Sequence, residues 1–152
     1  MVKTLSLMLV FSFLQSYSPV SSSGEAGLSI QANEPSYTVE QLLIVTTKFV
    51  NNLGRDVLIN NTGCGFPAFI LEKRVNEQWV GVGEPLCIAL ATSPTLLPNR
   101  KQVSATVQMT TEGMKNTPLT GIFRLRFFIT ERDNGQSLPS GLLVSNSFEI
   151  TR

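Results

Sequence analysis

The chain has 152 residues, with 12 lysines and arginines, 11 aspartates and glutamates, and no histidine. The missing histidines exclude Ser-His-Asp and Cys-His catalysis, histidine-ligated zinc and a histidine proton switch near neutral pH. Basic residues stand singly or in pairs such as Lys73-Arg74, and nucleic-acid-binding proteins need a clustered positive field, so we expect no nucleic-acid partner.

The N-terminus has the pattern of a cleavable signal peptide, which we place at residues 1–22. Lys3 precedes an apolar run at residues 5–14, and small residues at 20–23 offer cleavage sites. Ten helical residues span about 15 Å, half of a membrane's ~30 Å hydrocarbon core, so this run is too short to stay as an anchor. We therefore expect a secreted or periplasmic protein with no membrane span, whose single mature domain is residues 23–152.

The chain contains two cysteines, Cys64 and Cys87. In an oxidising compartment such a lone pair is expected to form a disulfide, which would restrict the unfolded chain by roughly 3 kcal/mol. The alternative, a reactive thiol pair, lacks the CxxC spacing typical of that chemistry. Two cysteines without histidine cannot complete a zinc site, and we expect no metal and no cofactor.

In the first two thirds of the chain, apolar and polar residues alternate as they do in half-buried β-strands. The expected elements are an edge strand at 28–30, a strand at 43–49, a turn at 51–54, a returning strand at 56–60, a hairpin of 69–75 with 78–82, and an irregular connection at 83–99. In the first strand of the hairpin, Phe69, Leu71 and Val75 share one face.

The last third alternates more regularly. Strands are expected at 103–109 and 123–129, followed by a turn at 133–135 and a closing strand in which Leu142, Val144, Phe148 and Ile150 share one face. In the strand at 123–129, Phe123, Leu125, Phe127 and Ile129 are expected to be buried, and Arg124 and Arg126 to face water. No long helical pattern interrupts this series, which predicts an all-β, antiparallel sandwich of seven or eight strands.

The segment Gly121-Ile122-Phe123-Arg124-Leu125 resembles the G-x-Y-x-C stretch of strand F in immunoglobulin-like domains. Leu96-Leu97-Pro98-Asn99 is similar to the turn entering the preceding strand, and residues 144–150 are similar to the last strand of small secreted bacterial immunoglobulin-like domains. The resemblance covers residues 28–151 and implies an immunoglobulin-like sandwich. The chain departs from antibody domains in having Phe123 for the corner tyrosine and Leu125 for the second cysteine. Cys64 and Cys87 are also too close in sequence to bridge strands B and F.

Candidate binding residues lie beside the cysteines. Phe66 and Pro67 follow Cys64, and Leu86 precedes Cys87, so a disulfide would hold an apolar loop ready to bind. These residues could equally cap one end of the sandwich. Trp79 could stack on a sugar ring or pack in the core.

Charged residues offer further candidates. Arg124, Arg126 and Phe128 form a stripe that could meet an acidic partner or simply face solvent. The carboxylates available for acid-base hydrolysis are Asp56, Glu72, Glu77 and Glu84, and their spacing does not force any two together.

These observations predict a secreted, non-enzymatic binding or assembly domain whose partner is a protein or, alternatively, a carbohydrate. A second hypothesis is a protease or hydrolase inhibitor that presents the loops at the disulfide. A third is a small enzyme that uses carboxylates alone. A fold of this class hosts many functions, so the site has to decide between them.

Overall fold

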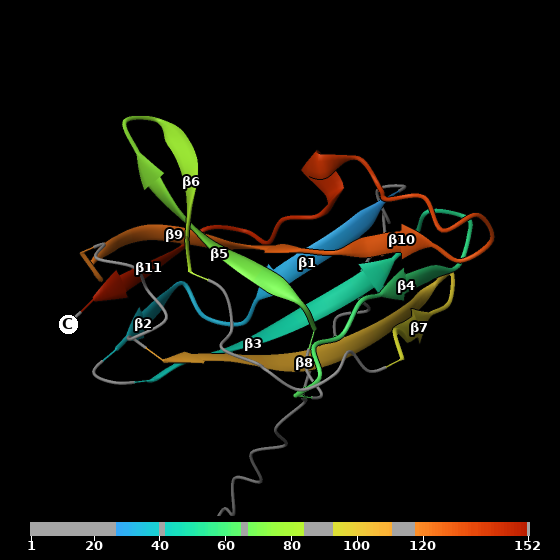
Figure 1. The fold of residues 1–152 in the computed structure, drawn as a ribbon, viewed down its shortest axis with the longest axis horizontal. Coiled ribbons are helices and arrows are strands. Elements are labelled where there is room, and N and C mark those ends of the chain that lie inside the picture. The colour runs from blue at the N-terminus through green and yellow to red at the C-terminus, as the bar shows by residue number, and fades with distance from the viewer. Residues whose placement is uncertain (1–26, 40–41, 65–66, 84–92, 111–117, 152) are drawn as a thin grey trace, which may run out of the picture.

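The structure is a computed structural model that describes residues 27–151 apart from 40–41, 65–66, 84–92 and 111–117, and these residues form an all-β fold (Figure 1). A five-stranded sheet has the order β2 (Ser36–Thr38), β11 (Phe148–Thr151), β9 (Gly121–Phe127), β5 (Phe69–Val75), β6 (Gln78–Gly83). A three-stranded sheet has the order β1 (Leu28–Ala32), β3 (Leu42–Asn51), β8 (Lys101–Thr110). A small sheet has the order β10 (Ile129–Glu131), β4 (Val57–Ile59), β7 (Thr95–Leu97), and a short 3₁₀ helix, η2 (Ser140–Leu142), precedes β11.

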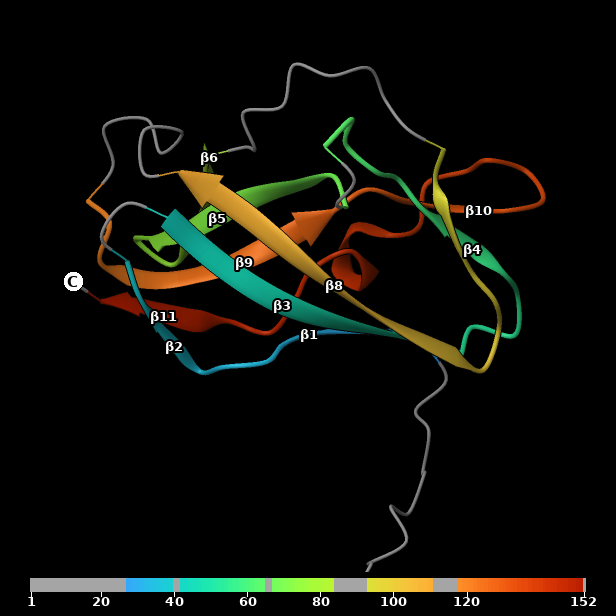
Figure 2. The ribbon, with the colours of Figure 1, turned by 90° about the horizontal axis from the view of Figure 1, so that it is seen from below.

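The five-stranded and three-stranded sheets pack against each other. Figure 2 shows β3 and β8 in one layer, with β5 and β9 in the layer behind. The core between the layers contains a pair of phenylalanines, Phe49 from β3 and Phe127 from β9, with ring centroids 4.9 Å apart. The pairings are antiparallel except that of β2 with β11, which is parallel.

The predicted buried faces are confirmed in the three longest runs, but Arg124, which was predicted to face water, is only 23% exposed because it packs against other side chains on the outer face. Phe123, Leu125, Phe127 and Ile129 are fully buried, as are Val45, Thr47 and Phe49 of β3. The buried hydroxyl of Thr47 donates a hydrogen bond to the carbonyl of Ala105 at 3.0 Å, which satisfies this polar group on the buried face of β3. Val107 and Met109 complete the buried face of β8.

Two predicted turns are also confirmed. The β5–β6 hairpin turns at Asn76 and Glu77, with φ of 47° and 65°. Positive φ at both central residues is typical of the type I′ turn, whose twist matches that of the flanking strands. The predicted turn at 133–135 follows β10, and Gly135 there has a φ of 68° that favours glycine.

The structure differs from the expected sandwich in its small third sheet, and the described residues form eleven strands where seven or eight were predicted. The strand after the first turn, β4, pairs with β10 and β7 and does not return along β3. Val75 is exposed because the β5–β6 hairpin projects beyond the rest of the sheet (Figure 1). Leu142 lies in η2 and not in the closing strand.

Several predictions fall outside the described residues. These are the signal peptide at 1–22, Phe66, Leu86 and Cys87, so the Cys64–Cys87 disulfide stays a prediction. Across the part of the chain that the structure describes, no helix has the length and apolar character needed to cross a membrane.

Candidate functional site

Charged side chains gather on the outer face of the five-stranded sheet, where a solvated surface would be expected. In the register, Glu72 of β5 lies opposite Arg124 of β9 and Gly81 of β6, and Arg74 lies opposite Trp79. Residues opposite one another in a sheet share a face. Glu72 contacts both Arg124 and Arg126, and Trp79 contacts Arg124. We call these four residues, Glu72, Trp79, Arg124 and Arg126, the arginine cluster.

Glu72 is the centre of the arginine cluster, and only 6% of its side chain is exposed. The Nε of Arg124 donates a hydrogen bond to Glu72 Oε2 at 2.7 Å. The Nε of Arg126 lies 2.8 Å from Glu72 Oε1, but the N–H is not aligned on that oxygen, so this buried donor has an ion-pair partner and no hydrogen-bond acceptor. One buried carboxylate therefore holds two guanidinium groups.

Trp79 fixes the other side of Arg124. The Arg124 Cζ atom lies 4.3 Å from the centroid of the Trp79 ring, which is a close cation–π contact. The Arg124 side chain is 23% exposed, whereas that of Arg126 is 40% exposed. Arg124 is thus packed between a carboxylate and an indole ring, and Arg126 presents more of its side chain to solvent. The predicted role of Trp79 as a sugar-stacking residue is not tested by this contact.

Local backbone irregularity makes room for Glu72. The β5–β6 pairing shifts register between Leu71 and Glu72, which leaves Val82 as an extra residue. Gly81, the residue opposite Glu72, has no side chain, and a Cβ there would lie 3.3 Å from Ile70 Cγ2. A bulge and a glycine on the edge strand therefore leave the space above β5 to the Glu72 carboxylate and its arginines.

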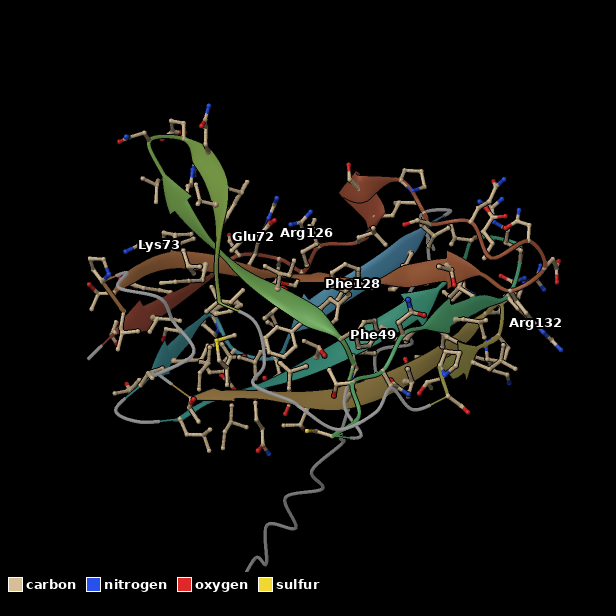
Figure 3. All side chains as sticks on the ribbon, viewed as in Figure 1. Phe49, Glu72, Lys73, Arg126, Phe128 and Arg132 are labelled. Atoms are coloured by element: carbon tan, nitrogen blue, oxygen red, sulfur yellow. The ribbon has the colours of Figure 1, made fainter. Side chains whose placement is uncertain are left out.

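Two exposed apolar residues flank the arginines, one within β9 and one directly after it. Ile122 and Phe128 are both well exposed, and alternation places them on the same face as Arg124 and Arg126. At about 3.4 Å per residue the row from Ile122 to Phe128 is about 20 Å long. Figure 3 shows Glu72 and Arg126 on the side of the sheet away from Phe49, between the projecting β5–β6 hairpin and η2. We call the row and the arginine cluster together the arginine surface.

The structure separates the other site residues predicted from the sequence. Pro67 is buried and forms an isolated bridge with Asn61, while Cys64 is exposed. Of the candidate carboxylates, Asp56 pairs with Arg132 and Glu77 with Arg74, and Glu84 lies outside the described residues. Only Glu72 and Trp79 join Arg124 and Arg126. Contact between Trp79 and Arg124 was not predicted, because it depends on how β6 and β9, which are distant in sequence, each pair with β5.

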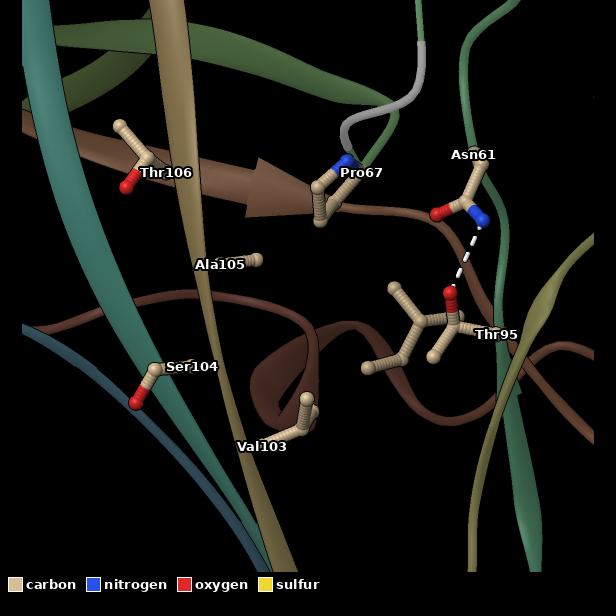
Figure 4. Close-up of a pocket in the computed structure, with 8 residues that line it drawn as sticks. Asn61, Pro67, Thr95, Val103, Ser104, Ala105 and Thr106 are labelled. Atoms are coloured by element: carbon tan, nitrogen blue, oxygen red, sulfur yellow. Dashed lines mark hydrogen bonds between the residues drawn. The ribbon is translucent and has the colours of Figure 1, made fainter.

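A cavity of about 270 Å³ lies at the side of β8 (Figure 4). Its walls are residues 103–106 of β8 on one side and Asn61, Pro67 and Thr95 on the other. Asn61 Nδ2 donates a hydrogen bond to Thr95 Oγ1 at 2.9 Å, shown dashed in Figure 4. The lining offers hydroxyls, one amide and apolar carbon, and none of the described lining residues is ionisable.

Acidic side chains in the described ranges matter as possible metal ligands and as partners of arginines. No group of three or more histidine, cysteine, aspartate or glutamate side chains there could hold a metal ion. Each described candidate carboxylate contacts an arginine. At Asp56, the Asn99 N–H and then Arg132 hold the carboxyl pKa below its usual value.

Comparison with known proteins gives no family. No protein-family model matches the sequence, and no curated protein matches it. One similar solved structure is the alkylpurine DNA glycosylase AlkC of Pseudomonas fluorescens bound to DNA with an abasic site analogue, at a TM-score of 0.40 and 10% identity over 84% of this chain and 31% of that one. This chain thus spans about a third of the glycosylase.

Another similar structure is AvmM, which catalyses macrocyclization in alchivemycin A biosynthesis. Its TM-score is 0.34 and its identity 13%, over 82% of this chain and 88% of that one. Similarities at this level support no inference about function.

Proposed function

We propose that the chain is a secreted, non-enzymatic binding or assembly domain with an immunoglobulin-like strand arrangement, and that it binds a protein through the arginine surface. The strand order supports the first part. The sheet β1-β3-β8 corresponds in order to strands A, B and E of immunoglobulin domains, and β11-β9-β5-β6 to strands G, F, C and C′. The small β10-β4-β7 sheet is an addition to that arrangement.

The arginine surface carries the functional part of the proposal. Arg124 is held between Glu72 and Trp79, so little side-chain entropy remains to be lost when a partner binds. Arginine and tryptophan are the residue types over-represented at binding hot spots, and exposed Ile122 and Phe128 add apolar area beside them. A solvated face would not need a buried carboxylate to organise its arginines.

Export and the absence of catalysis rest on different observations. Lys3 and the apolar run at residues 5–14 support export. The pairing of Asp56, Glu72 and Glu77 with arginines supports a non-enzymatic role, because each of these carboxylates is already engaged in an ion pair.

Site-specific photocrosslinking tests this proposal. A photoreactive phenylalanine analogue replaces Phe128 in one variant and Ile44 in another. Each variant is mixed with the secreted proteins of the organism that produces this chain and is then irradiated. Ile44 is the matched control, since it is 48% exposed on the outer face of the three-stranded sheet and Phe128 is 44% exposed directly after β9. We expect a discrete protein adduct from position 128 and none from position 44. Equal adducts from both positions, or none from position 128, would contradict the proposal.

A further inference from the structure

Arg126 has its Nε buried against Glu72, whereas 40% of its side chain is exposed, so the part of the guanidinium beyond Nε is what it offers to a ligand. Arg124 uses its Nε on Glu72 and its face on Trp79, and Arg132 donates to Asp56. We infer that Arg126 binds a carboxylate of the partner, presented by an acidic, extended peptide segment with apolar neighbours. This inference rests on the proposed binding function of the arginine surface.

The charge balance of the arginine cluster favours an anion. Glu72 contributes one negative charge against the two positive charges of Arg124 and Arg126. The cluster therefore keeps an excess positive charge, and Arg126 is the more exposed of its two arginines. A guanidinium presents its N–H donors in a planar fork that matches the two oxygens of a carboxylate. A ligand carboxylate at Arg126 would neutralise the positive charge that Glu72 leaves uncompensated.

The apolar flank at Phe128 favours a peptide over a free anion. Phe128 is two residues after Arg126, about 7 Å away along the chain, and it is 44% exposed. Side chains on one face of an extended peptide recur with the same spacing. An acidic residue over Arg126 would thus place an apolar residue, two positions away, over Phe128.

The other end of the arginine surface gives the site a direction. Glu149 of β11 lies opposite Ile122 in the register and faces the same side of the sheet. Its negative charge disfavours an acidic group near Ile122, at the far end of the row from Phe128. The ligand should therefore bind in one direction, with its carboxylate at the Arg126–Phe128 end of the row.

A peptide selection tests the inference. A random twelve-residue library displayed on phage is selected against the exported full chain, and the enriched peptides are measured against the wild type, Arg126→Gln and Lys48→Gln. Lys48 is an exposed cation on the outer face of the three-stranded sheet, so its variant controls for loss of one positive charge. We expect enriched peptides with Asp or Glu two positions from an apolar residue. We also expect at least tenfold weaker binding for Arg126→Gln and no change for Lys48→Gln.

Changes in the peptide complete the test. Replacing its acidic residue by the amide should weaken binding to the wild type at least tenfold and should have little further effect in Arg126→Gln, because both changes remove the same contact. Enriched peptides without an acidic requirement, or with equal affinity for Arg126→Gln, would overturn the inference. If a phosphoserine peptide binds more than tenfold tighter than its glutamate version, the group that Arg126 recognises is a phosphate and the carboxylate inference is overturned.

This outcome is separable from that of the proposed function. If position 128 gives a crosslink but peptide binding is insensitive to Arg126→Gln, the proposed binding surface is supported and the carboxylate contact at Arg126 is contradicted. If peptide binding depends on the carboxylate but position 128 gives no adduct, the proposed protein partner is contradicted and the preference of Arg126 for an anion is supported.

Discussion

Phe49 of β3 and Phe127 of β9 meet edge to face, with ring centroids 4.9 Å apart and an interplanar angle of 76°. The contact joins the two large sheets, and Phe127 also packs against Phe69 of β5. Because side chains alternate along a strand, burying Phe127 places Arg126 on the outer face. Core packing thus determines which residues form the arginine surface.

Substitution of Phe127 by alanine is expected to lower the free energy of unfolding by about 3–5 kcal/mol, the usual cost of removing a buried phenylalanine. The matched control is Phe128→Ala, one residue away. Phe128 is exposed, so its loss should change stability by no more than about 0.5 kcal/mol. Urea denaturation of both variants measures the difference, and similar losses would show that the register of β9 is wrong.

Glu72→Gln is expected to cost about 1–3 kcal/mol, because it removes the buried charge that two arginines share and keeps the side-chain shape. Glu77→Gln is the control. Glu77 also pairs with an arginine, but that pair is exposed and its loss should cost about 0–1 kcal/mol. Thermal unfolding compares the two variants, and equal effects would contradict the central role given to Glu72.

Asn51→Ala tests the contact between β3 and β7. Its buried side chain donates hydrogen bonds to the carbonyls of Leu97 and Arg55 at 3.0 and 2.8 Å, and it accepts one from the Leu53 N–H. Truncation leaves buried backbone groups unpaired, so we expect a loss of about 2 kcal/mol or more. Asn134→Ala, in an exposed turn with two side-chain hydrogen bonds, should cost less. Chemical denaturation that ranks them in the reverse order would contradict this assignment.

Acid stability should depend on Asp56. Its pKa in the folded state is lowered by the Asn99 N–H and by Arg132. A carboxyl with a lowered pKa stabilises the fold fully above its unfolded value of about 3.9, and this contribution disappears as the pH falls through the lower folded value. Denaturation midpoints between about pH 6 and pH 2 should therefore fall more steeply for the wild type than for Asp56→Asn. Parallel curves for the two proteins would contradict the shift.

Much of the strand pattern follows from local sequence. Alternation of apolar and polar residues predicted the buried faces of β3, β8 and β9, because a period of two is imposed by the strand itself. The third sheet could not be predicted in this way. The pairing of β4 with β10 joins residues about seventy positions apart, and nothing in the short sequence of β4 distinguishes that partner from β3.

The candidate site was predicted only in part. Arg124, Arg126 and Phe128 were placed on one outward face, which the register confirms for the arginines opposite Ile70 and Glu72. The buried carboxylate between them was not predicted. Its burial requires the register shift after Leu71 and the missing side chain at Gly81, and both depend on how β6 pairs with β5.

The most direct test of the binding surface is the dissociation constant of the crosslinked partner for Phe128→Ala and Ile44→Ala. Both residues are similarly exposed, and neither substitution should disturb the core. We predict at least about fivefold weaker binding for Phe128→Ala, the effect of losing an anchoring aromatic worth ~1 kcal/mol, and wild-type affinity for Ile44→Ala. Wild-type affinity for Phe128→Ala, or an equal loss in both variants, would contradict the assignment of the arginine surface as the binding site.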